Sequence, residues 1–572
     1  MPKIELSQQA FFTYLGTELA DSELEQLLTI AKAELDESAD ADGIVKIELN
    51  DTNRPDLWST AGLARQLRVY REATVPSYTF FSHPDHTADS AERRVVVDPG
   101  LAEIRPYIAA FAVEGAPIDE ALLNDVIQTQ EKLCWNYGRK RSSIAMGVYR
   151  TDLISYPVRY LAADPDATGF VPLGATTRMS MRRMLSEHQK GLEFGSIVAD
   201  FERFPLLTDD NGDVLSFPPI INSDRIGAVE EGDAKLFIEM TGTDMPSLLT
   251  ACAIVACDFS DAGYTVLPVT VEYPYDTPVG RHVTTPFYFQ RPASTTVEYV
   301  ARLLGRSIEP QELIDGLRRM GIAAEHADGT LTVRPPEYRN DFLHAVDIVE
   351  DAMIGIGMDS FAPEVPSDFT VGRLLPSELY ARRVTSQLIG LGYQEMIFNY
   401  LGSRRDFVER MYPRDQWQRA CAEHVQVDNP MSENFEFVRR SILPHLLIAE
   451  SVSANAVYPH YIFEVGKIVR RDPHDNYGSL TRDSVGMLCA DVEAGFSLMS
   501  SHISVLFYYL GLQYSLREVS DGRFIQGRAA EIVISSRAVG RFGEIHPEVL
   551  EKFGIQMPCA ACEIDLDSVM EL

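Results

Sequence analysis

The chain has 572 residues, of which 51 are Lys or Arg and 84 are Asp or Glu, so its formal net charge is -33 at pH 7. Hydrophobic residues make up 45% and charged residues 24%, and these ordinary globular values exclude wholesale disorder. Because Lys and Arg carry phosphate binding, the acidity argues against a protein that grips nucleic acid over its whole surface. One basic patch, or a basic partner, is compatible with it. At roughly 150 residues per domain, the length predicts about four domains.

The sequence predicts a cytoplasmic protein with no membrane association. Its first residues contain no basic stretch followed by an apolar run, so we expect no secretory signal. The most apolar run, residues 248–257, is about half as long as a membrane span. Seven scattered cysteines are typical of reduced thiols. Cys559 and Cys562 form an isolated C-x-x-C, and the lack of a second pair or of paired histidines in the nearby sequence argues against a metal or redox role.

Residues 1–90 are predicted to form an N-terminal α/β domain. Leucines recur at helical spacing near its start, residues 43–50 have the pattern of a strand, and Pro55 suits the start of a further helix. The polar, turn-rich residues 80–94 mark a candidate domain boundary.

Residues 91–285 mix strand and helix patterns and include a basic cluster. Residues 1–60 hold 4 Lys or Arg against 13 Asp or Glu, but residues 61–150 hold 11 of each class. Here aromatic residues alternate with cations: Lys132, Trp135, Tyr137, Arg139, Lys140 and Arg141. Such a cluster can hold phosphates and stack bases. The alternative, which the cluster alone favours, is a solvated helix end with a half-buried tryptophan, because cations suit a helix C-terminus.

A second candidate site follows a predicted strand, Leu236–Met240. The strand runs into residues 241–244, Thr-Gly-Thr-Asp, where glycine permits a tight turn that would aim the hydroxyls into a cleft. The alternative is a strand end that caps a helix, since Asp244 before Pro246 makes a good N-cap. Residues 222–224 form a further polar tip after two prolines.

The third segment, residues 286–362, contains a predicted helix with an acidic side. Its four carboxylates are Asp341, Asp347, Glu350 and Asp351. At about 100° per residue, the last three fall on one side of the helix, and clustered carboxylates can hold a hard cation such as Mg²⁺. On spacing alone, a solvated acidic face is the favoured explanation.

Residues 371–572 are predicted to be α/β with antiparallel strands. A helix ending near Gly390 and Gly392 precedes several strand-like runs. No G-x-S-x-G, H-E-x-x-H or G-x-x-x-x-G-K-[ST] motif occurs anywhere in the sequence. The residues therefore carry no self-contained signature of hydrolysis or nucleotide binding.

Nine fragments, in register over essentially the full length, resemble the β subunits of phenylalanyl-tRNA synthetases in their archaeal/eukaryotic-type form. They include QEKLCWNYGRKRSSIAMGVY, FIEMTGTD, PPEYRNDFLHAVDIVEDAMIGIG and VDNPMSENFEFVRRSILPHLL. The resemblance implies an α2β2 heterotetramer that joins phenylalanine to tRNA(Phe) at the expense of ATP. It implies that the α subunit binds the ATP and carries the synthetic site.

The resemblance also implies an α+β multidomain fold. Residues 91–285 would be a mixed α/β tRNA-editing domain, residues 286–362 a small helical, winged-helix-like domain similar to DNA-binding domains, and residues 371–572 a class II synthetase-like module with an antiparallel sheet. We expect that module to lack catalysis, because FVRRSILP lacks the Glu of an F-R-x-E motif and no late G-x-G-x-x-x-R motif occurs. The tRNA is expected to meet the α subunit and the basic residues 139–141.

Editing is implied because tyrosine differs from phenylalanine by one hydroxyl, and an apolar pocket rejects an added hydroxyl by only about a hundredfold. A second site whose polar groups favour that hydroxyl can hydrolyse the mischarged ester. The positions that match the family's editing motifs are Leu207, Ser216, Glu239 and Thr241, with Asn222 and Thr243 nearby.

Each editing position has an expected role. Leu207 would wall the side-chain pocket, and Glu239 would accept from the tyrosine hydroxyl or from the attacking water. Thr241 and Ser216 would orient the substrate. Archaeal relatives tend to have Asp at position 239, so the reach of this pocket differs from theirs.

For the four carboxylates Asp341, Asp347, Glu350 and Asp351, the resemblance implies a Mg²⁺ site that is shared with the α subunit and is structural rather than catalytic. Two other functions stay open. The chain could be a non-catalytic scaffold with a degenerate editing cleft, which the Glu at position 239 keeps open. It could also be a free-standing hydrolase of mischarged tRNA, which the long C-terminal module argues against.

Overall fold

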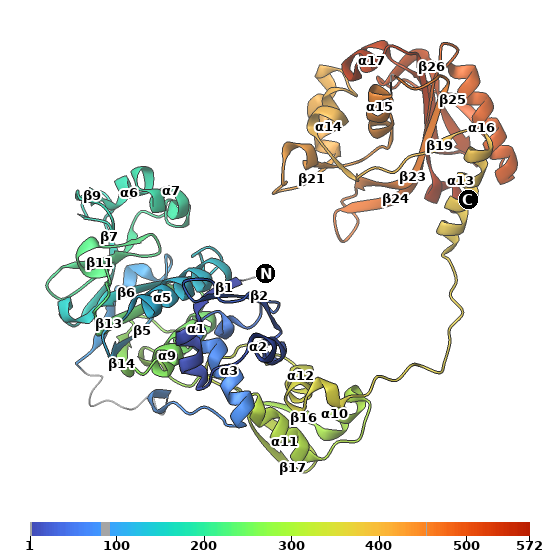
Figure 1. The fold of residues 1–572 in the computed structure, drawn as a ribbon. Coiled ribbons are helices and arrows are strands. Elements are labelled where there is room, and N and C mark those ends of the chain that lie inside the picture. The colour runs from blue at the N-terminus through green and yellow to red at the C-terminus, as the bar shows by residue number, and fades with distance from the viewer. Residues whose placement is uncertain (1–2, 82–91, 454) are drawn as a thin grey trace. The chain divides into compact units, whose positions relative to one another are not determined.

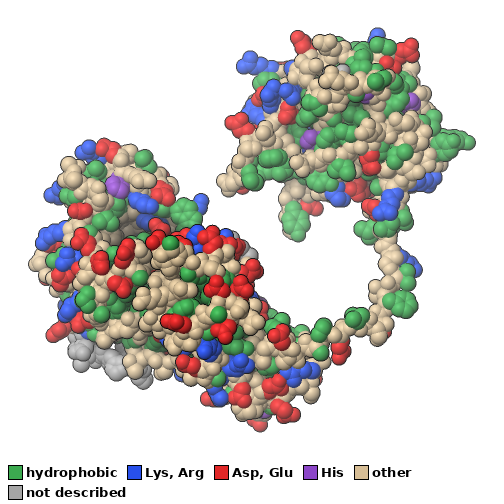
Figure 2. All heavy atoms as spheres, viewed as in Figure 1, with side chains coloured by type: hydrophobic (Ala, Val, Ile, Leu, Met, Phe, Trp, Pro, Cys, Tyr) green, Lys and Arg blue, Asp and Glu red, His purple; other side chains and the backbone are tan. Residues whose placement is uncertain are grey.

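The structure is a computed structural model, and it describes residues 3–81, 92–453 and 455–572. The chain divides into two compact units, residues 1–364 and 365–572 (Figure 1). Each unit has its own hydrophobic cores. The domain boundary expected at residue 90 lies outside the described residues. Acidic side chains are spread widely over the face of unit 1 shown in Figure 2.

Unit 1 begins with a small antiparallel sheet and three helices. The elements are β1 (Lys3–Ser7), α1 (Gln8–Leu15), α2 (Asp21–Leu28), β2 (Ala33–Glu37), β3 (Ile44–Leu49) and α3 (Thr60–Glu72). The strands pair in the order β1-β3-β2. Arg65 of α3 is buried and donates to Asp258 and Asp261 of α9 (Met245–Asp261). These ion pairs tie the first segment to the large sheet that follows.

A ten-stranded mixed sheet forms the centre of unit 1. Its strands are β4 (Arg94–Val97), β5 (Tyr107–Glu114), β6 (Ile144–Arg150), β7 (Val158–Ala163), β10 (Phe204–Thr208), β11 (Val214–Phe217), β12 (Ile221–Asn222), β13 (Lys235–Gly242), β14 (Thr265–Glu272) and β15 (His282–Thr285). The order is β12-β11-β10-β7-β4-β14-β5-β13-β6, with β15 beside β14. Most neighbours are antiparallel, but β4 runs parallel to both β7 and β14.

Helices and one short hairpin surround this sheet. They are α5 (Glu120–Lys132), β8 (Gly169–Phe170), β9 (Met179–Ser180), α6 (Met181–Glu187), α7 (Gln189–Phe194), α8 (Asp224–Gly227) and α9. The apolar run at residues 248–257 lies within α9, which packs on β5 and β13 and is buried along most of its length. Among the described residues, no helix has the length and apolar character that a membrane crossing needs.

The last part of unit 1 contains a sheet as well as helices. Its elements are β16 (Ala293–Thr296), α10 (Val297–Leu304), α11 (Pro310–Arg319), β17 (Ala323–Ala327), β18 (Thr330–Arg334) and α12 (Ala345–Ile356), with strand order β16-β18-β17. The expected description of residues 286–362 as a small helical domain is therefore incomplete. Strands β17 and β18 form a hairpin whose turn lies at Asp328 and Gly329, with φ angles of 49° and 77°. The dipeptide Asp-Gly is a strong sequence signal for such a turn.

Unit 2 is built on a seven-stranded sheet in the order β19-β23-β24-β28-β27-β26-β25. All pairs are antiparallel except β19 with β23. The strands are β19 (Gln394–Glu395), β23 (His460–Arg471), β24 (Ser479–Ala490), β25 (Ser515–Glu518), β26 (Phe524–Ile534), β27 (Arg537–Ile545) and β28 (Cys559–Asp565). The remaining elements are α13 (Pro376–Gly390), β20 (Leu401–Gly402), α14 (Trp417–Glu423), β21 (Val425–Gln426), β22 (Phe437–Val438), α15 (Leu443–Val452), α16 (Phe496–Leu510), α17 (Pro547–Phe553) and α18 (Leu566–Met570).

The isolated C-x-x-C lies on β28 in the middle of this sheet. A spacing of three along a strand places two side chains on opposite faces. Accordingly, Cys559 belongs to one hydrophobic core and Cys562 to another. The two thiols are free and buried, and their separation by the sheet gives a packing reason for both.

Candidate functional site

The residues expected for editing lie on three strands of the large sheet. Leu207 is on β10, Ser216 on β11, and Glu239 and Thr241 on β13. Leu207 and Ser216 face each other across β10 and β11, whereas Glu239 and Thr241 are two residues apart and so share one face of β13. None of these four residues is more than 3% exposed. They form a closed, buried cluster in this structure.

Tyr149 of β6 links Ser216 to Glu239, a role that the sequence does not predict. Its hydroxyl lies 2.8 Å from Ser216 Oγ and 2.8 Å from Glu239 Oε1, and it donates to the carboxylate. Because β6 and β11 stand near opposite ends of the strand order, the sheet must curl to bring them into contact. Gly147 makes the close approach possible, since a Cβ there would collide with the Tyr149 hydroxyl.

Thr241 is held by Arg105, a second residue that no sequence motif marks. Arg105 is 2% exposed and donates through Nε to Thr241 Oγ1 at 2.9 Å and through Nη2 to the Thr241 carbonyl at 2.6 Å. Burial lowers the pKa of Arg105, and no described carboxylate forms an ion pair with it. Because Arg105 donates to Oγ1, the Thr241 hydroxyl keeps its own proton for another acceptor.

Glu239 is the titratable group of this cluster. Burial raises the pKa of Glu239 to about 7, although the hydrogen bond from Tyr149 and the charge of Arg105 oppose the rise. Its Oε2 is buried and has no hydrogen-bond partner among the described residues. A carboxylate with a pKa near neutrality and one available oxygen can accept a hydroxyl proton or act as a base.

The two neighbouring positions fall in different places. Asn222 on β12 is the cross-strand partner of Ser216, so the structure brings it to the cluster. Thr243 lies beyond the end of β13, where its amide donates to the Ser143 carbonyl at 3.1 Å. Thr243 lines a separate groove that opens beside the N-terminus of α9.

This groove, here called the basic groove, has a volume of about 1020 Å³. Its lining is mainly polar and comes from four parts of unit 1: Lys3, Thr52, Trp58, Lys132, Asn136, Tyr137, Arg139, Ser143, Thr243, Asp244 and Ser247. As expected from the sequence, Asp244 caps α9, accepting from the amide of Ser247 at 3.0 Å.

The basic cluster at residues 132–141 divides between two roles. Lys132 and Arg139 line the basic groove. Arg141 stacks 4.4 Å from the Phe194 ring and donates to the Pro219 and Ile220 carbonyls, so it holds two loops together. Lys140 lies 5.3 Å from the exposed ring of Trp135.

The backbone of this cluster is strained. Arg139, Lys140 and Arg141 have φ angles of 49°, 53° and 67°, a left-handed conformation that costs a non-glycine residue roughly 1–2 kcal/mol. Hydrogen bonds from the Lys140 and Arg141 amides to the Trp135 and Cys134 carbonyls, both 2.8 Å long, fix the turn. Strain of this kind is often retained where side chains must be displayed at a binding site.

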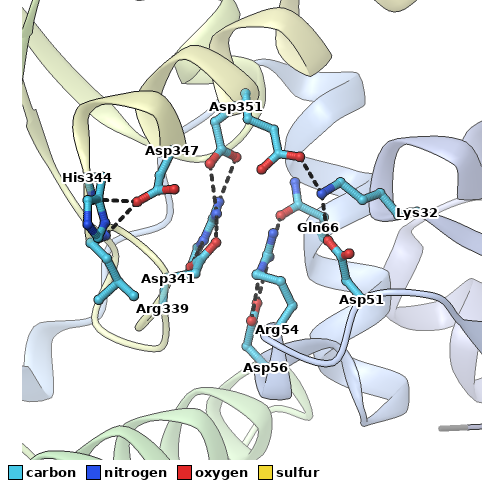
Figure 3. Close-up of polar contacts among 12 residues, drawn as sticks. Lys32, Asp51, Arg54, Asp56, Gln66, Arg339, Asp341, His344, Asp347 and Asp351 are labelled. Carbon is cyan, nitrogen blue, oxygen red and sulfur yellow. Dashed lines mark hydrogen bonds and ion pairs between the residues drawn. The ribbon is translucent and has the colours of Figure 1, made fainter. Parts of the chain in front are cut away.

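The four carboxylates expected to bind Mg²⁺ are held instead by groups of this chain (Figure 3). Arg339 is 2% exposed and lies between Asp341 and Asp351, with bonds of 2.5–2.9 Å to both. Asp347 caps α12 by accepting from the Leu343 and His344 amides. Glu350 pairs at 2.6 Å with Lys32, which also pairs with Asp51.

These contacts do not fit a metal centre within the chain. Burial alone would raise the pKa of Asp341, but the Arg339 guanidinium holds it at about 2. In the described parts of the sequence, no group of three or more His, Cys, Asp or Glu side chains is arranged to hold a metal ion. Glu350 instead joins this segment to the N-terminal segment through Lys32.

The cavity of unit 2 is lined by arginines that are already paired. It has a volume of about 790 Å³, and its lining includes Arg440, Arg523 and Arg541. Arg440 pairs with Glu423, whereas Arg523 and Arg541 both pair with Asp521. These three guanidinium groups are therefore bound to carboxylates of the same chain.

Two family models define the class of this protein. Residues 293–358 match the tRNA synthetase B5 domain, and residues 362–566 match the phenylalanyl tRNA synthetase beta chain CLM domain. The seven-stranded sheet of unit 2 lies within the second match, and the mixed sheet of unit 1 precedes both matches in the sequence. The chain is therefore a multidomain aminoacyl-tRNA synthetase subunit.

Relatives match over the full length. Phenylalanine–tRNA ligase β subunits from Borrelia hermsii and Treponema pallidum are each 44% identical to this chain, with 100% of both chains covered. An N-terminal fragment of the phenylalanyl-tRNA synthetase β subunit from Pyrococcus horikoshii has a TM-score of 0.58 at 32% identity, covering 62% of this chain and 100% of the fragment. The chain belongs to the phenylalanine–tRNA ligase β-subunit family. The expected family is confirmed, while these full-length relatives are bacterial and do not confirm the archaeal/eukaryotic-type qualifier.

Proposed function

We propose that this β subunit assembles with an α subunit as an α2β2 phenylalanine–tRNA ligase and hydrolyses Tyr-tRNA(Phe) in unit 1. The α subunit would bind ATP and charge tRNA(Phe), in the cytoplasm. The observation that carries the proposal is the buried cluster of Glu239, Tyr149, Ser216 and Thr241, in which Glu239 Oε2 has no partner among the described residues. Residues 91–285 would be the editing domain, and residues 286–362 and 371–572 the winged-helix-like and class II-like modules.

The geometry supports recognition of a tyrosine side chain. Leu207 supplies an apolar wall, and Glu239 Oε2 can accept from a phenol that a phenylalanine side chain lacks. Hydrolysis adds water across the ester, so that its acyl C–O bond breaks and free tyrosine and the tRNA 3′ hydroxyl are released. Because the cluster is at most 3% exposed, the structure around it must open to admit the substrate.

A second function is favoured by Tyr149. Its hydroxyl already forms hydrogen bonds with Ser216 Oγ and Glu239 Oε1. These are groups to which a substrate hydroxyl would bind. The same contacts would make the cleft degenerate, and the chain a non-catalytic scaffold for the α subunit. Tyr-tRNA(Phe) deacylation by the assembled enzyme separates the two functions.

We further propose the archaeal/eukaryotic-type architecture for this subunit, supported by the match to the Pyrococcus horikoshii fragment over 100% of that fragment. Use of Mg²⁺ and ATP is consistent with the family. A Mg²⁺ site on Asp341, Asp347, Glu350 and Asp351 that an α subunit completes stays a prediction. The ion pairs of these residues within the chain do not support it.

Tyr149→Phe is expected to shift the pH profile of deacylation upward. Glu239 must be ionised to accept a hydroxyl proton, so the rate should rise as pH increases through about 7, the pKa of its carboxyl. The hydrogen bond from Tyr149 lowers that pKa, and its removal should raise the midpoint while the plateau at high pH is retained. The measurement is the rate of Tyr-tRNA(Phe) deacylation against pH, corrected for uncatalysed ester hydrolysis. An unchanged midpoint would contradict the link between Tyr149 and Glu239.

A further inference from the structure

We propose that a small cavity between α3, α5 and α9 binds one alkali cation, Na⁺ or K⁺, through oxygens of Asp125, Thr129 and Asp258. The cavity lies in unit 1, apart from the candidate editing cluster and from the acidic residues of α12. Its lining residues are Ala61, Leu122, Asp125, Val126, Thr129, Met146, Val255, Asp258 and Phe259. None of them has a role in the proposed hydrolysis, so the inference does not depend on that function.

The cavity has room for one occupant the size of a water molecule. It leaves about 20 Å³ for the centre of such an occupant, and about 10–15 Å³ is enough to hold one. Leu122 and Val126 of α5 are half-buried, so the cavity lies just beneath the surface and its occupant can exchange with solvent. A hydrated Mg²⁺ ion does not suit this space, because Mg²⁺ usually keeps several of its waters.

Two buried oxygens at this cavity have no hydrogen-bond partner among the described residues. They are Thr129 Oγ1 and Asp258 Oδ2, and their residues are 4% and 9% exposed. Because a buried polar group without a partner is unfavourable, such a group beside a cavity indicates that a water or an ion completes its contacts. Thr129 lies on α5 and Asp258 on α9, so a shared ligand would join the two helices.

The charges around the cavity leave one negative charge without a partner. Asp258 shares Arg65 with Asp261, which also pairs with Arg68. Asp125 forms no ion pair with any cation in the described part of the chain. Three carboxylates are thus balanced by two guanidinium groups. Since an unbalanced buried charge is costly, a single positive charge in the cavity would stabilise this arrangement.

The two carboxylates at the cavity are both hard to ionise. Burial raises the pKa of Asp258 to about 7, and the charge of Asp125 adds to the rise. Burial also raises the pKa of Asp125, although the Thr60 amide and hydroxyl, which donate to its Oδ1 at 3.0 and 2.7 Å, oppose the rise. Either a bound proton or a bound cation relieves such a pair.

The geometry favours a cation over a proton or a water. A proton on Asp258 would leave the Thr129 hydroxyl without a partner, because Thr129 Oγ1 and Asp258 Oδ2 form no hydrogen bond with each other. A water molecule could bind both oxygens but would not balance the charge. An alkali cation does both, since carboxylate and hydroxyl oxygens are the ligands that hard cations prefer.

The test is hydrogen exchange of the full chain in NaCl, KCl or tetramethylammonium chloride at equal ionic strength. Mass spectrometry follows peptides from α5 and α9 at about pH 8, where Asp258 is ionised. Tetramethylammonium is too large for the cavity and serves as the reference ion. At about ten times its Kd, a bound cation should slow exchange in both helices by about tenfold. Comparison of NaCl with KCl identifies the preferred ion.

Thr129→Val removes one proposed ligand and keeps the shape of the side chain. We expect the tenfold slowing by Na⁺ or K⁺ to fall to about twofold or less in this variant. Exchange in tetramethylammonium chloride should stay within about twofold of wild type, because the Thr129 hydroxyl has no hydrogen bond to lose.

Thr250→Val is the matched control. Thr250 is a buried threonine of α9 whose hydroxyl donates to the Pro246 carbonyl at 3.0 Å, and it does not line the cavity. Its replacement should speed exchange equally in the three salts and leave the cation effect intact.

Each outcome supports or overturns the proposal. Equal exchange of wild type in the three salts would overturn it and identify the occupant as a water or a proton. A cation effect of full size in Thr129→Val would also overturn it, because the ions would then act elsewhere. Should Thr129→Val fail to fold, Asp125→Asn replaces it, since the amide oxygen still accepts from Thr60 while the charge is lost; a full cation effect there has the same meaning.

Discussion

Replacing Glu239 with methionine is expected to lower kcat/KM for Tyr-tRNA(Phe) hydrolysis by roughly 30- to 150-fold, because a buried hydroxyl left without an acceptor costs about 2–3 kcal/mol. Methionine is similar in length but offers no carboxylate oxygen to a tyrosine hydroxyl. The measurement is the deacylation of preformed Tyr-tRNA(Phe) by the assembled enzyme. Charging of phenylalanine should be unchanged, since the synthetic site is proposed to lie on the α subunit.

Glu187→Met provides the control for this substitution. Glu187 is an exposed residue of α6 whose side chain pairs with Arg183, so its loss should leave deacylation within twofold or so of wild type. A Glu239→Met enzyme that assembles, charges phenylalanine and still hydrolyses Tyr-tRNA at the wild-type rate would refute the role given to Glu239.

Arg339→Met is expected to destabilise unit 1 by about 3–5 kcal/mol, because it leaves two buried carboxylates without their cation. Arg339 is enclosed by Asp341 and Asp351, which are 11% and 7% exposed at their side chains. The exposed pair Arg318–Asp315 is the control, and Arg318→Met should cost less than about 1 kcal/mol. Denaturant unfolding followed by hydrogen exchange at residues 293–358 measures both variants and separates this region from unit 2.

The pH dependence of this effect has a definite sign. The pKa of Asp341 is about 2 in the folded chain, below its ordinary value of about 3.9. Its ion pair therefore stabilises the fold fully above about pH 4 and is lost as pH falls toward 2. The difference between wild type and Arg339→Met should narrow over that interval. A constant difference, or one below about 1 kcal/mol at neutral pH, would show that Arg339 does not hold these carboxylates.

Local features of the fold were accessible from the sequence. The strand at 43–50, the N-cap at Asp244 and the buried helix over residues 248–257 all follow from patterns within a few residues. The Asp328-Gly329 hairpin also has a local sequence signal, but the helical periodicity of residues 342–352 by itself predicts only a helix in this segment. The spacing of Asp347, Glu350 and Asp351 predicts that they share one side of the helix, yet spacing within one helix contains no information about cations from elsewhere in the chain.

The partners of the candidate site could not be predicted in this way. Tyr149 meets Ser216 and Glu239 only because the sheet curls until β6 approaches β11. Arg105 reaches Thr241 across 136 positions of sequence. Lys32 likewise binds Glu350 across 318 positions. Such contacts depend on the tertiary fold. The resemblance to the family points to Glu239 as a candidate acceptor, but it does not indicate the residues that set the protonation and geometry of Glu239.

The central claim is that this β subunit removes tyrosine from mischarged tRNA(Phe). The most direct measurement is the deacylation of preformed Tyr-tRNA(Phe) by the enzyme assembled from this chain and its α subunit, with Phe-tRNA(Phe) as the comparison substrate. We predict rapid release of tyrosine, slow release of phenylalanine, and loss of the difference in Glu239→Met. Tyr-tRNA(Phe) that is no less stable in the presence of the assembled, charging-competent enzyme than in buffer would contradict the claim and identify the chain as a scaffold with a degenerate cleft.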